Sequence, residues 1–175
     1  MENKKKSKTK KLVASALFMA LAFIATRFFA FSLPTGYANL GDCFAFLAGF
    51  VLGGAWGAIA SGIGIALADV LSPYIIYAPA TLIIKAFIAL CGAFAAKYAA
   101  GEGRLKFLVI AALSLLGEVM MVLGYFFFES VFLNVGTAAV ASVPGNLTQA
   151  AVGVVTSTVL AILFTKNKRL KELIK

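Results

Sequence analysis

Long apolar stretches dominate the chain, and only short loops with Pro, Gly or clustered charge interrupt them. A helix needs about 20 apolar residues to cross a bilayer. Hydrophobic residues make up 62% of the chain and charged residues only 13%, which leaves no room for a soluble domain. The sequence predicts an all-α integral membrane protein, a bundle of six transmembrane helices at approximately 12–31, 40–53, 55–71, 80–99, 107–132 and 146–165.

Basic residues gather at the two ends of the chain. Residues 1–11 contain six Lys and Glu2, and residues 166–175 contain five basic residues and Glu172. Residues 12–165 contain five basic and five acidic residues and therefore sum to zero. The positive-inside rule predicts that both basic tails are cytoplasmic, which requires an even number of spans.

This even number decides how the apolar stretch 38–71 is divided. By length it fits either one long span or two short ones that turn at Gly53-Gly54, and only two spans keep both tails on one side. The loops 32–39, 72–79 and 133–145 then face outward, and none contains Lys or Arg. The lysine-rich start also resembles a signal peptide, but its apolar run of 20 residues exceeds a signal core of about 7–15 residues. An uncleaved first helix is favoured.

Several chemistries are excluded by residue types. The chain has no His and only two cysteines, Cys43 and Cys91, which are too few thiols for a zinc site and are expected to be buried apolar side chains. It has no GxxxxGK[ST] phosphate-binding loop, so it cannot use ATP alone. We expect a protein that is not an enzyme, with no cofactor and no metal.

Ionisable side chains inside membrane spans are costly and usually mark a binding site or a pathway. With the topology above, five of them lie in the outer half of the bundle: Arg27, Asp42, Asp69, Lys85 and Glu129. Glu118 lies near the midplane. This asymmetry favours a protein that captures something from outside.

Helical spacing places the polar residues on three stripes. Thr81 and Lys85 share a face, and so do Glu118, Tyr125 and Glu129 on the next helix and Asn146, Gln149 and Gly153 on the last. Together with outer-loop residues they predict a pocket for a small planar heteroaromatic ligand. The candidate substrate-binding residues are Asn39, Tyr74, Tyr77, Thr81, Lys85, Glu118, Tyr125, Asn146 and Gln149.

Simpler roles remain open for several of these groups. Lys85 could pair with Asp69 or Glu118 only to hold the bundle together. Asp42 and Asn146 could cap helices. Arg27 and Glu129 lie near enough to the interface to extend their charges into water.

Small residues form a separate pattern. Ala16 and Ala20 form an AxxxA step near the cytoplasmic end of the first helix, a candidate docking face for another membrane protein. The small residues Gly53, Gly57, Ser61, Gly62 and Gly64 are more simply explained by close helix packing inside the bundle.

Several motifs together resemble one transporter family. They are Tyr37-Ala-Asn39-Leu-Gly41-Asp42, Ala68-Asp69, Tyr77-Ala-Pro79-Ala-Thr81-Leu-Ile-Ile-Lys85, Gly124-Tyr125 with Glu129, and Pro144-Gly-Asn146-Leu-Thr-Gln149. The chain resembles the substrate-binding (S) components of energy-coupling factor (ECF) vitamin transporters, in the riboflavin-type branch that also contains pyridoxine-like and hydroxymethylpyrimidine-like carriers.

The resemblance implies a six-helix subunit of the plasma membrane that binds a vitamin or precursor near its outer face. It also implies partners, a shared transmembrane coupling subunit and two ABC-type ATPases, with Ala16 and Ala20 on the contacting helix. The expected substrate is vitamin B6-like, pyrimidine-like or a flavin. The alternative is an ion-coupled secondary transporter that acts alone through Asp69 or Glu118, although no internal repeat typical of such carriers is evident.

Overall fold

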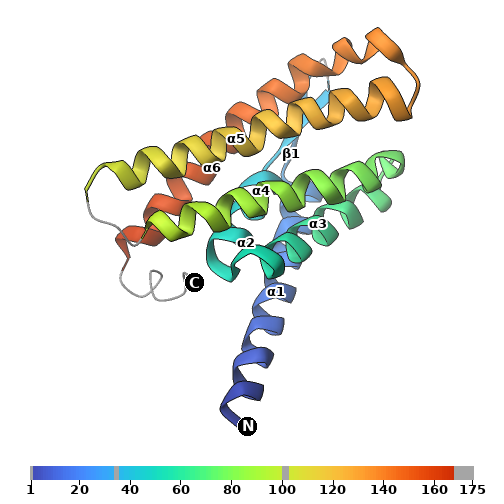
Figure 1. The fold of residues 1–175 in the computed structure, drawn as a ribbon. Helices are drawn as coiled ribbons and strands as arrows, with labels where there is room; N and C mark the ends of the chain where they lie inside the picture. Colours follow the sequence, from blue (N-terminus) through green and yellow to red (C-terminus); the bar gives the residue numbers. More distant parts are fainter. Residues whose placement is uncertain (1, 34–35, 100–102, 168–175) are drawn as a thin grey trace.

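In the computed structural model, residues 2–33, 36–99 and 103–167 are described. They form six α-helices and one two-stranded antiparallel hairpin (Figure 1): α1 (Glu2–Phe28), β1 (Ala30–Leu33), β2 (Gly36–Asn39), α2 (Gly41–Leu52), α3 (Gly54–Val70), α4 (Ala78–Ala99), α5 (Leu105–Phe127) and α6 (Val143–Lys166). The expected six-helix membrane bundle is confirmed. Three short helical turns join its elements: η1 (Ile75–Tyr77), η2 (Phe128–Phe132, a π-helical turn) and η3 (Gly136–Ser142).

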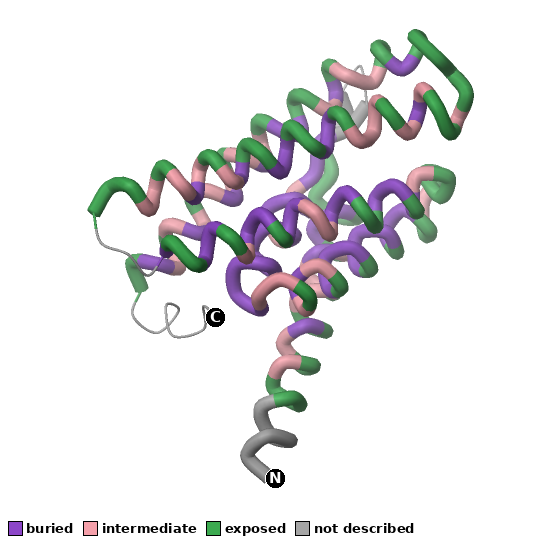
Figure 2. Tube along the Cα trace, in the orientation of Figure 1, coloured by how far each residue is buried: buried purple, intermediate pink, exposed green. Residues whose placement is uncertain are grey.

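The helices differ in whether they are long enough to span a bilayer. Among the residues that the structure describes, four helical segments are long and apolar enough to cross: Lys8–Phe28, Ile75–Ala99, Leu105–Phe132 and Gly136–Lys166. By contrast, α2 has 12 residues and α3 has 17, so both are shorter than an ordinary span. Nearly all of α2 is buried (Figure 2), and its side chains therefore pack against protein on almost every side.

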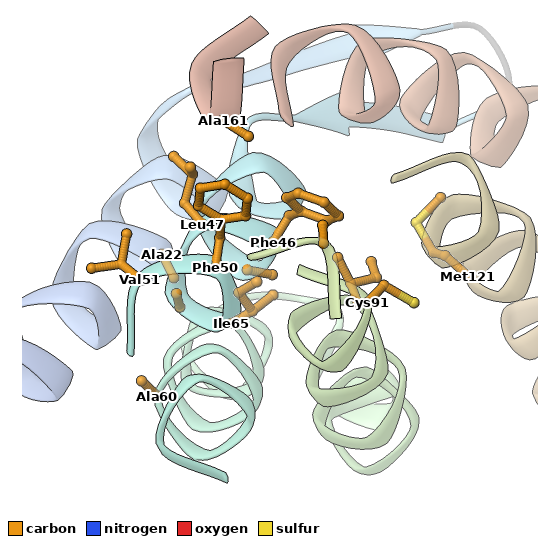
Figure 3. Packing of buried hydrophobic residues seen from close by; sticks show 14 of the residues in the cluster. Ala22, Phe46, Leu47, Phe50, Val51, Ala60, Ile65, Cys91, Met121 and Ala161 are labelled. Carbon is orange, nitrogen blue, oxygen red and sulfur yellow. The ribbon is translucent and has the colours of Figure 1, made fainter. Parts of the chain in front are cut away.

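Helix α4 occupies the centre of the bundle. It packs against α2, α3 and α5, while α1 covers α2 and α3 on the other side. Helices α5 and α6 run side by side (Figure 1), and α6 also contacts α2 and β2. The apolar core includes Phe46 and Phe50 of α2, whose rings stack with centroids 6.3 Å apart, and Met121 of α5 (Figure 3).

Glycines allow the central helices to touch backbone to backbone. A Cβ atom on Gly49 of α2 would overlap the carbonyl oxygen of Ala89 in α4, and one on Gly92 would overlap the carbonyl oxygen of Phe46. The turn between α2 and α3 falls at Gly53, whose φ of 84° lies in the left-handed region that favours glycine. In α3, Gly64 lies against the backbone of Met19 in α1, which agrees with an internal packing role for the α3 glycines.

Element boundaries depart from the expected ones mainly at the chain segments between helices. Helix α1 begins at Glu2, so it runs through the lysine-rich segment, and it ends at Phe28 rather than near residue 31. Residues 30–39, expected as the end of a helix and a loop, form the hairpin, with Ala30 opposite Asn39. Backbone pairing satisfies polar groups that a loose loop would leave to solvent.

The segment before α6 is also more ordered than a loop. Helix α6 begins at Val143 rather than near residue 146, with Pro144 in its first turn, where a missing N–H costs nothing. Residues 100–102 of the expected 97–106 turn and residues 168–175 of the expected basic tail lie outside the described residues.

The close α2–α4 contact predicts a sharp difference between two glycine substitutions. Gly49→Ala should lower the thermal stability of the detergent-solubilised protein, because its methyl group displaces the α4 backbone, an overpacking cost of about 1–3 kcal/mol or more. Gly117→Ala is the control, since the nearest atoms to its new methyl group would lie 3.5 Å away. Equal melting temperatures of the two variants, measured by tryptophan fluorescence, would contradict the backbone contact between α2 and α4.

Candidate functional site

A cavity of about 130 Å³ lies among the ends of the helices that are remote from the start of α1 and the end of α6. The hairpin, the end of α3, η1, η2, η3 and the start of α6 all contribute to its wall. Its lining residues are Thr26, Asn39, Ile65, Asp69, Tyr74, Tyr77, Lys85, Tyr125, Glu129, Ser142, Gly145, Asn146 and Gln149. The polar wall therefore draws on nearly every element of the bundle.

A buried ion pair adjoins this cavity, because one of its members, Lys85, lines the wall. The Nζ atom of Lys85 lies 2.5 Å from Oδ1 of Asp42, and the two side chains are 2% and 0% exposed. The other oxygen, Oδ2 of Asp42, accepts a hydrogen bond of 2.6 Å from the amide of Gln149. One carboxylate thus joins α2 to α4 and α6. Lys85 pairs with neither Asp69 nor Glu118, so the partners considered from the sequence were wrong.

The same geometry removes two simpler roles. Helix α2 has no side-chain cap from Asp42, because Leu40 is the N-cap residue and Asp42 lies in the first turn. Asn146 does not cap α6 either, since the N-cap is Ser142 and Asn146 lies within the helix and lines the cavity.

Asn39 and Gln149 form an amide pair between the hairpin and α6. The side-chain oxygen of Asn39 accepts a 2.8 Å hydrogen bond from the backbone N–H of Gly41, which fixes its orientation at the start of α2. Its Nδ2 then donates to Oε1 of Gln149 at 3.3 Å. Both amides are buried, and their shared contact leaves them fixed at the cavity wall.

A chain of hydroxyl groups leads from α5 to α3. Thr81 donates its only hydroxyl proton to Oδ2 of Asp69 at 2.5 Å. The hydroxyl of Tyr125, 2.9 Å from the Thr81 oxygen, must therefore be the donor in that contact. Thr81 does not line the cavity itself but holds two residues that do.

Glu129 is held at the rim by two hydroxyl groups. Its carboxylate accepts hydrogen bonds from the hydroxyl of Tyr77 at 3.2 Å and from Ser142 at 2.6 Å. The residue is only 7% exposed, so the alternative in which it extends into the interface water was wrong. The π-helical turn η2 places Glu129 here, and such turns are common at functional sites. Arg27, in contrast, is exposed at the end of α1.

Tyrosine rings line one side of the cavity. Tyr74 and Tyr77 meet edge to face with centroids 6.3 Å apart, and Tyr77 and Tyr125 do so at 6.2 Å. The ammonium group of Lys85 lies 5.4 Å from the centroid of the Tyr125 ring. Aromatic faces and fixed amides in one enclosed space suit a planar, hydrogen-bonding ligand.

Glu118 lies outside the cavity wall. Its carboxyl group is 1% exposed and packs against Gly153 of α6, where any Cβ atom would overlap it. Neither of its oxygens has a hydrogen-bond partner among the described residues. Cys43 and Cys91 are buried, as expected, and no group of three or more His, Cys, Asp or Glu in the described ranges could hold a metal ion.

Most of the candidate residues named from the sequence meet at this cavity, but several wall residues were missed. Asp69 and Glu129 had been noted as intramembrane charges and within the family motifs, and Glu129 also on the polar stripe, but neither was named as a substrate-binding residue. Gly145 appeared only within a motif, and Thr26, Ile65 and Ser142 had not been noted at all. The cost of an intramembrane carboxylate could have selected Asp69 and Glu129. Ser142 gave no such signal, because it lies in a segment expected to be loop.

A polar, tyrosine-lined cavity within a membrane helix bundle defines a membrane protein that binds a small molecule. The family model described as ECF-type riboflavin transporter, S component, matches residues 6–166, and the chain belongs to this family. It is therefore a membrane-embedded transport subunit for vitamin uptake. The chain is also 33% identical over 132 residues, 75% of its length and 84% of the relative's, to an uncharacterized protein in the gap 3′ region of Pyrococcus woesei. No solved structure matches the chain.

The ion pair predicts strongly non-additive effects on stability. Asp42→Asn and Lys85→Met should each destabilise the protein by about 3–5 kcal/mol, because each leaves one buried charge unpaired. The double variant should lose much less than the sum of the two, since it leaves no charge behind. Melting curves of the four proteins in one detergent give the comparison, and additive losses would show that the two groups do not pair.

Proposed function

We propose that this S component captures a small vitamin or vitamin precursor from the cell exterior and that the cavity holds it. The observation that carries the proposal is the convergence of fixed amides, tyrosine rings and carboxylates from distant parts of the chain on one enclosed space. Intramembrane polar groups are costly, and nothing in packing alone requires so many at one end of the bundle. Family membership supplies the class of ligand.

In this proposal the residues divide into two groups. Hydrogen bonds to the polar edge of the ligand come from the side-chain amides of Asn39, Gln149 and Asn146, and the tyrosines stack on its ring. The side-chain amide of Asn146 has no hydrogen-bond partner among the described residues, so it is available to a ligand. Lys85 and Thr81 support the cavity wall. Lys85 does so through its ion pair with Asp42, and Thr81 through its hydrogen bonds with Asp69 and Tyr125. Glu118 acts from behind the wall, through the packing of α5 against α6.

The basic start of α1 and the end of α6 lie away from the cavity. From the positive-inside rule we propose that the cavity faces the exterior of the plasma membrane. The ligand then has to cross to the cytoplasm, and the chain has no phosphate-binding loop to drive this step. We propose that a shared transmembrane coupling subunit and two ABC-type ATPases supply the energy. Ala16 and Ala20 are exposed on α1 and form the proposed docking face.

The binding site is tested by two substitutions on α6. Gln149→Ala and Asn146→Ala should each weaken binding of the best ligand from a panel containing riboflavin, pyridoxine and hydroxymethylpyrimidine. A lost buried hydrogen bond of about 1–3 kcal/mol corresponds to a loss of affinity of roughly 5–150-fold. Thr148→Ala is the control, because Thr148 is exposed on the same helix and, among the described residues, its hydroxyl bonds only to the carbonyl oxygen of Pro144. Unchanged affinity in both test variants would remove the pocket assignment.

The docking face is tested separately from binding. Ala16→Trp and Ala20→Trp should leave ligand affinity in detergent intact but abolish uptake by cells, because a bulky ring prevents close helix contact. Ala112→Trp is the matched control, since Ala112 is an exposed alanine on α5. Normal copurification of the ATPases with both α1 variants would refute the docking face.

Gradient-driven uptake by liposomes that contain this chain alone would instead favour the ion-coupled transporter.

A further inference from the structure

The buried ionisable groups around the cavity do not balance in charge. Among the described residues they comprise one amine, Lys85, and four carboxyl groups, Asp42, Asp69, Glu118 and Glu129. The one ion pair within the described ranges joins Lys85 to Asp42, so the single positive charge already has a partner. Asp69 and Glu129, which line the cavity, form no ion pair with any described residue.

Within the described ranges, the side-chain hydrogen bonds to these two carboxylates come only from neutral hydroxyl groups. Asp69 accepts from the hydroxyl of Thr81, and Glu129 accepts from Tyr77 and Ser142. A carboxylate offers about four acceptor sites, so both retain acceptor capacity toward the cavity. Neutral hydroxyl groups orient a negative charge but do not cancel it, and an uncancelled charge away from water is costly.

The tyrosines add a second, independent preference for positive charge. Tyr74, Tyr77 and Tyr125 surround the same space as the two carboxylates. The face of an aromatic ring attracts a cation within about 6 Å of its centroid, and rings combined into a cage are a recurrent means of binding organic ammonium groups. A neutral ligand uses the stacking surface but leaves both carboxylates uncompensated, and an anionic ligand is repelled.

We propose that the ligand is an organic cation, a small planar heteroaromatic molecule that carries a protonated nitrogen next to Asp69 and Glu129. This inference rests on the proposed function and names the substrate class of the same site. It excludes phosphorylated and carboxylated forms of a vitamin, and it ranks neutral flavins below charged ring amines. The positive charge of the ligand offsets part of the negative charge that the Lys85–Asp42 pair leaves uncompensated.

Three compounds with one ring and different charge test the proposal. Pyridoxamine, pyridoxine and 4-pyridoxate carry an ammonium, a hydroxyl and a carboxylate group, respectively, on the same carbon framework. Calorimetry with the full chain in detergent near neutral pH should give affinity in that order, with pyridoxamine at least tenfold tighter than pyridoxine. In Glu129→Gln and Asp69→Asn, which keep hydrogen-bond acceptors but remove charge, this ratio should fall roughly tenfold or more. Arg27→Gln, an exposed charge removal, should leave the ratio unchanged.

A cooperative melting transition in the same detergent shows that the charge variants are folded, so a lower ratio of pyridoxamine to pyridoxine affinity reports the lost charge. Equal or tighter binding of pyridoxine or 4-pyridoxate by the wild type would overturn the inference, as would a ratio that survives in both variants. If none of the three compounds binds while riboflavin does, the inference is overturned and the proposed function stands. If riboflavin, the three ring compounds and hydroxymethylpyrimidine all fail to bind, the proposed function falls as well.

Discussion

The carboxylate of Asp42 is the contact on which the arrangement of this bundle depends. It is fully buried, it holds the ammonium group of Lys85 on α4, and it accepts the amide of Gln149 on α6. In a membrane, apolar surface gives little preference for one helix neighbour over another, because lipid tails are as apolar as leucine side chains. A charge and an amide that need specific partners supply the missing specificity, and they fix how α2, α4 and α6 meet.

That contact is possible only because the helices approach so closely. Gly49 and Gly92 bring the backbones of α2 and α4 into contact, and Asp42 and Lys85 lie one to two turns further along the same pair of helices. The short length of α2 also makes this contact possible. Since α2 is surrounded by protein, it does not have to span lipid, and its first turn can reach the depth at which Lys85 and Gln149 lie. The apolar core therefore sets the positions of the polar groups above it.

The sequence predicted the membrane bundle and much of the cavity because both follow from local rules. Apolar length and charge asymmetry gave the helices, and helical spacing placed Lys85, Tyr125 and Gln149 on inward faces. The sequence did not predict which polar side chains pair with each other. Asp42 and Gln149 are 107 residues apart, and nothing local distinguishes Asp42 from Asp69 as the partner of Lys85. The hairpin and η3 were missed because short ordered segments between helices depend on tertiary contacts rather than on periodicity.

The two classes of carboxylate in this protein follow from their different partners. Asp42 forms an ion pair with Lys85 and accepts a hydrogen bond from the amide of Gln149, so its charge is balanced within the protein. Its role is to hold helices together. In the part of the chain that the structure describes, Asp69 and Glu129 accept side-chain hydrogen bonds only from hydroxyl groups, which orient their oxygens and leave the charge to act on whatever enters the cavity. A purely structural carboxylate has no reason to remain uncompensated in a bilayer. Asp69 and Glu129, which line the cavity and form no ion pair among the described residues, are therefore the carboxylates best suited to recognise a ligand.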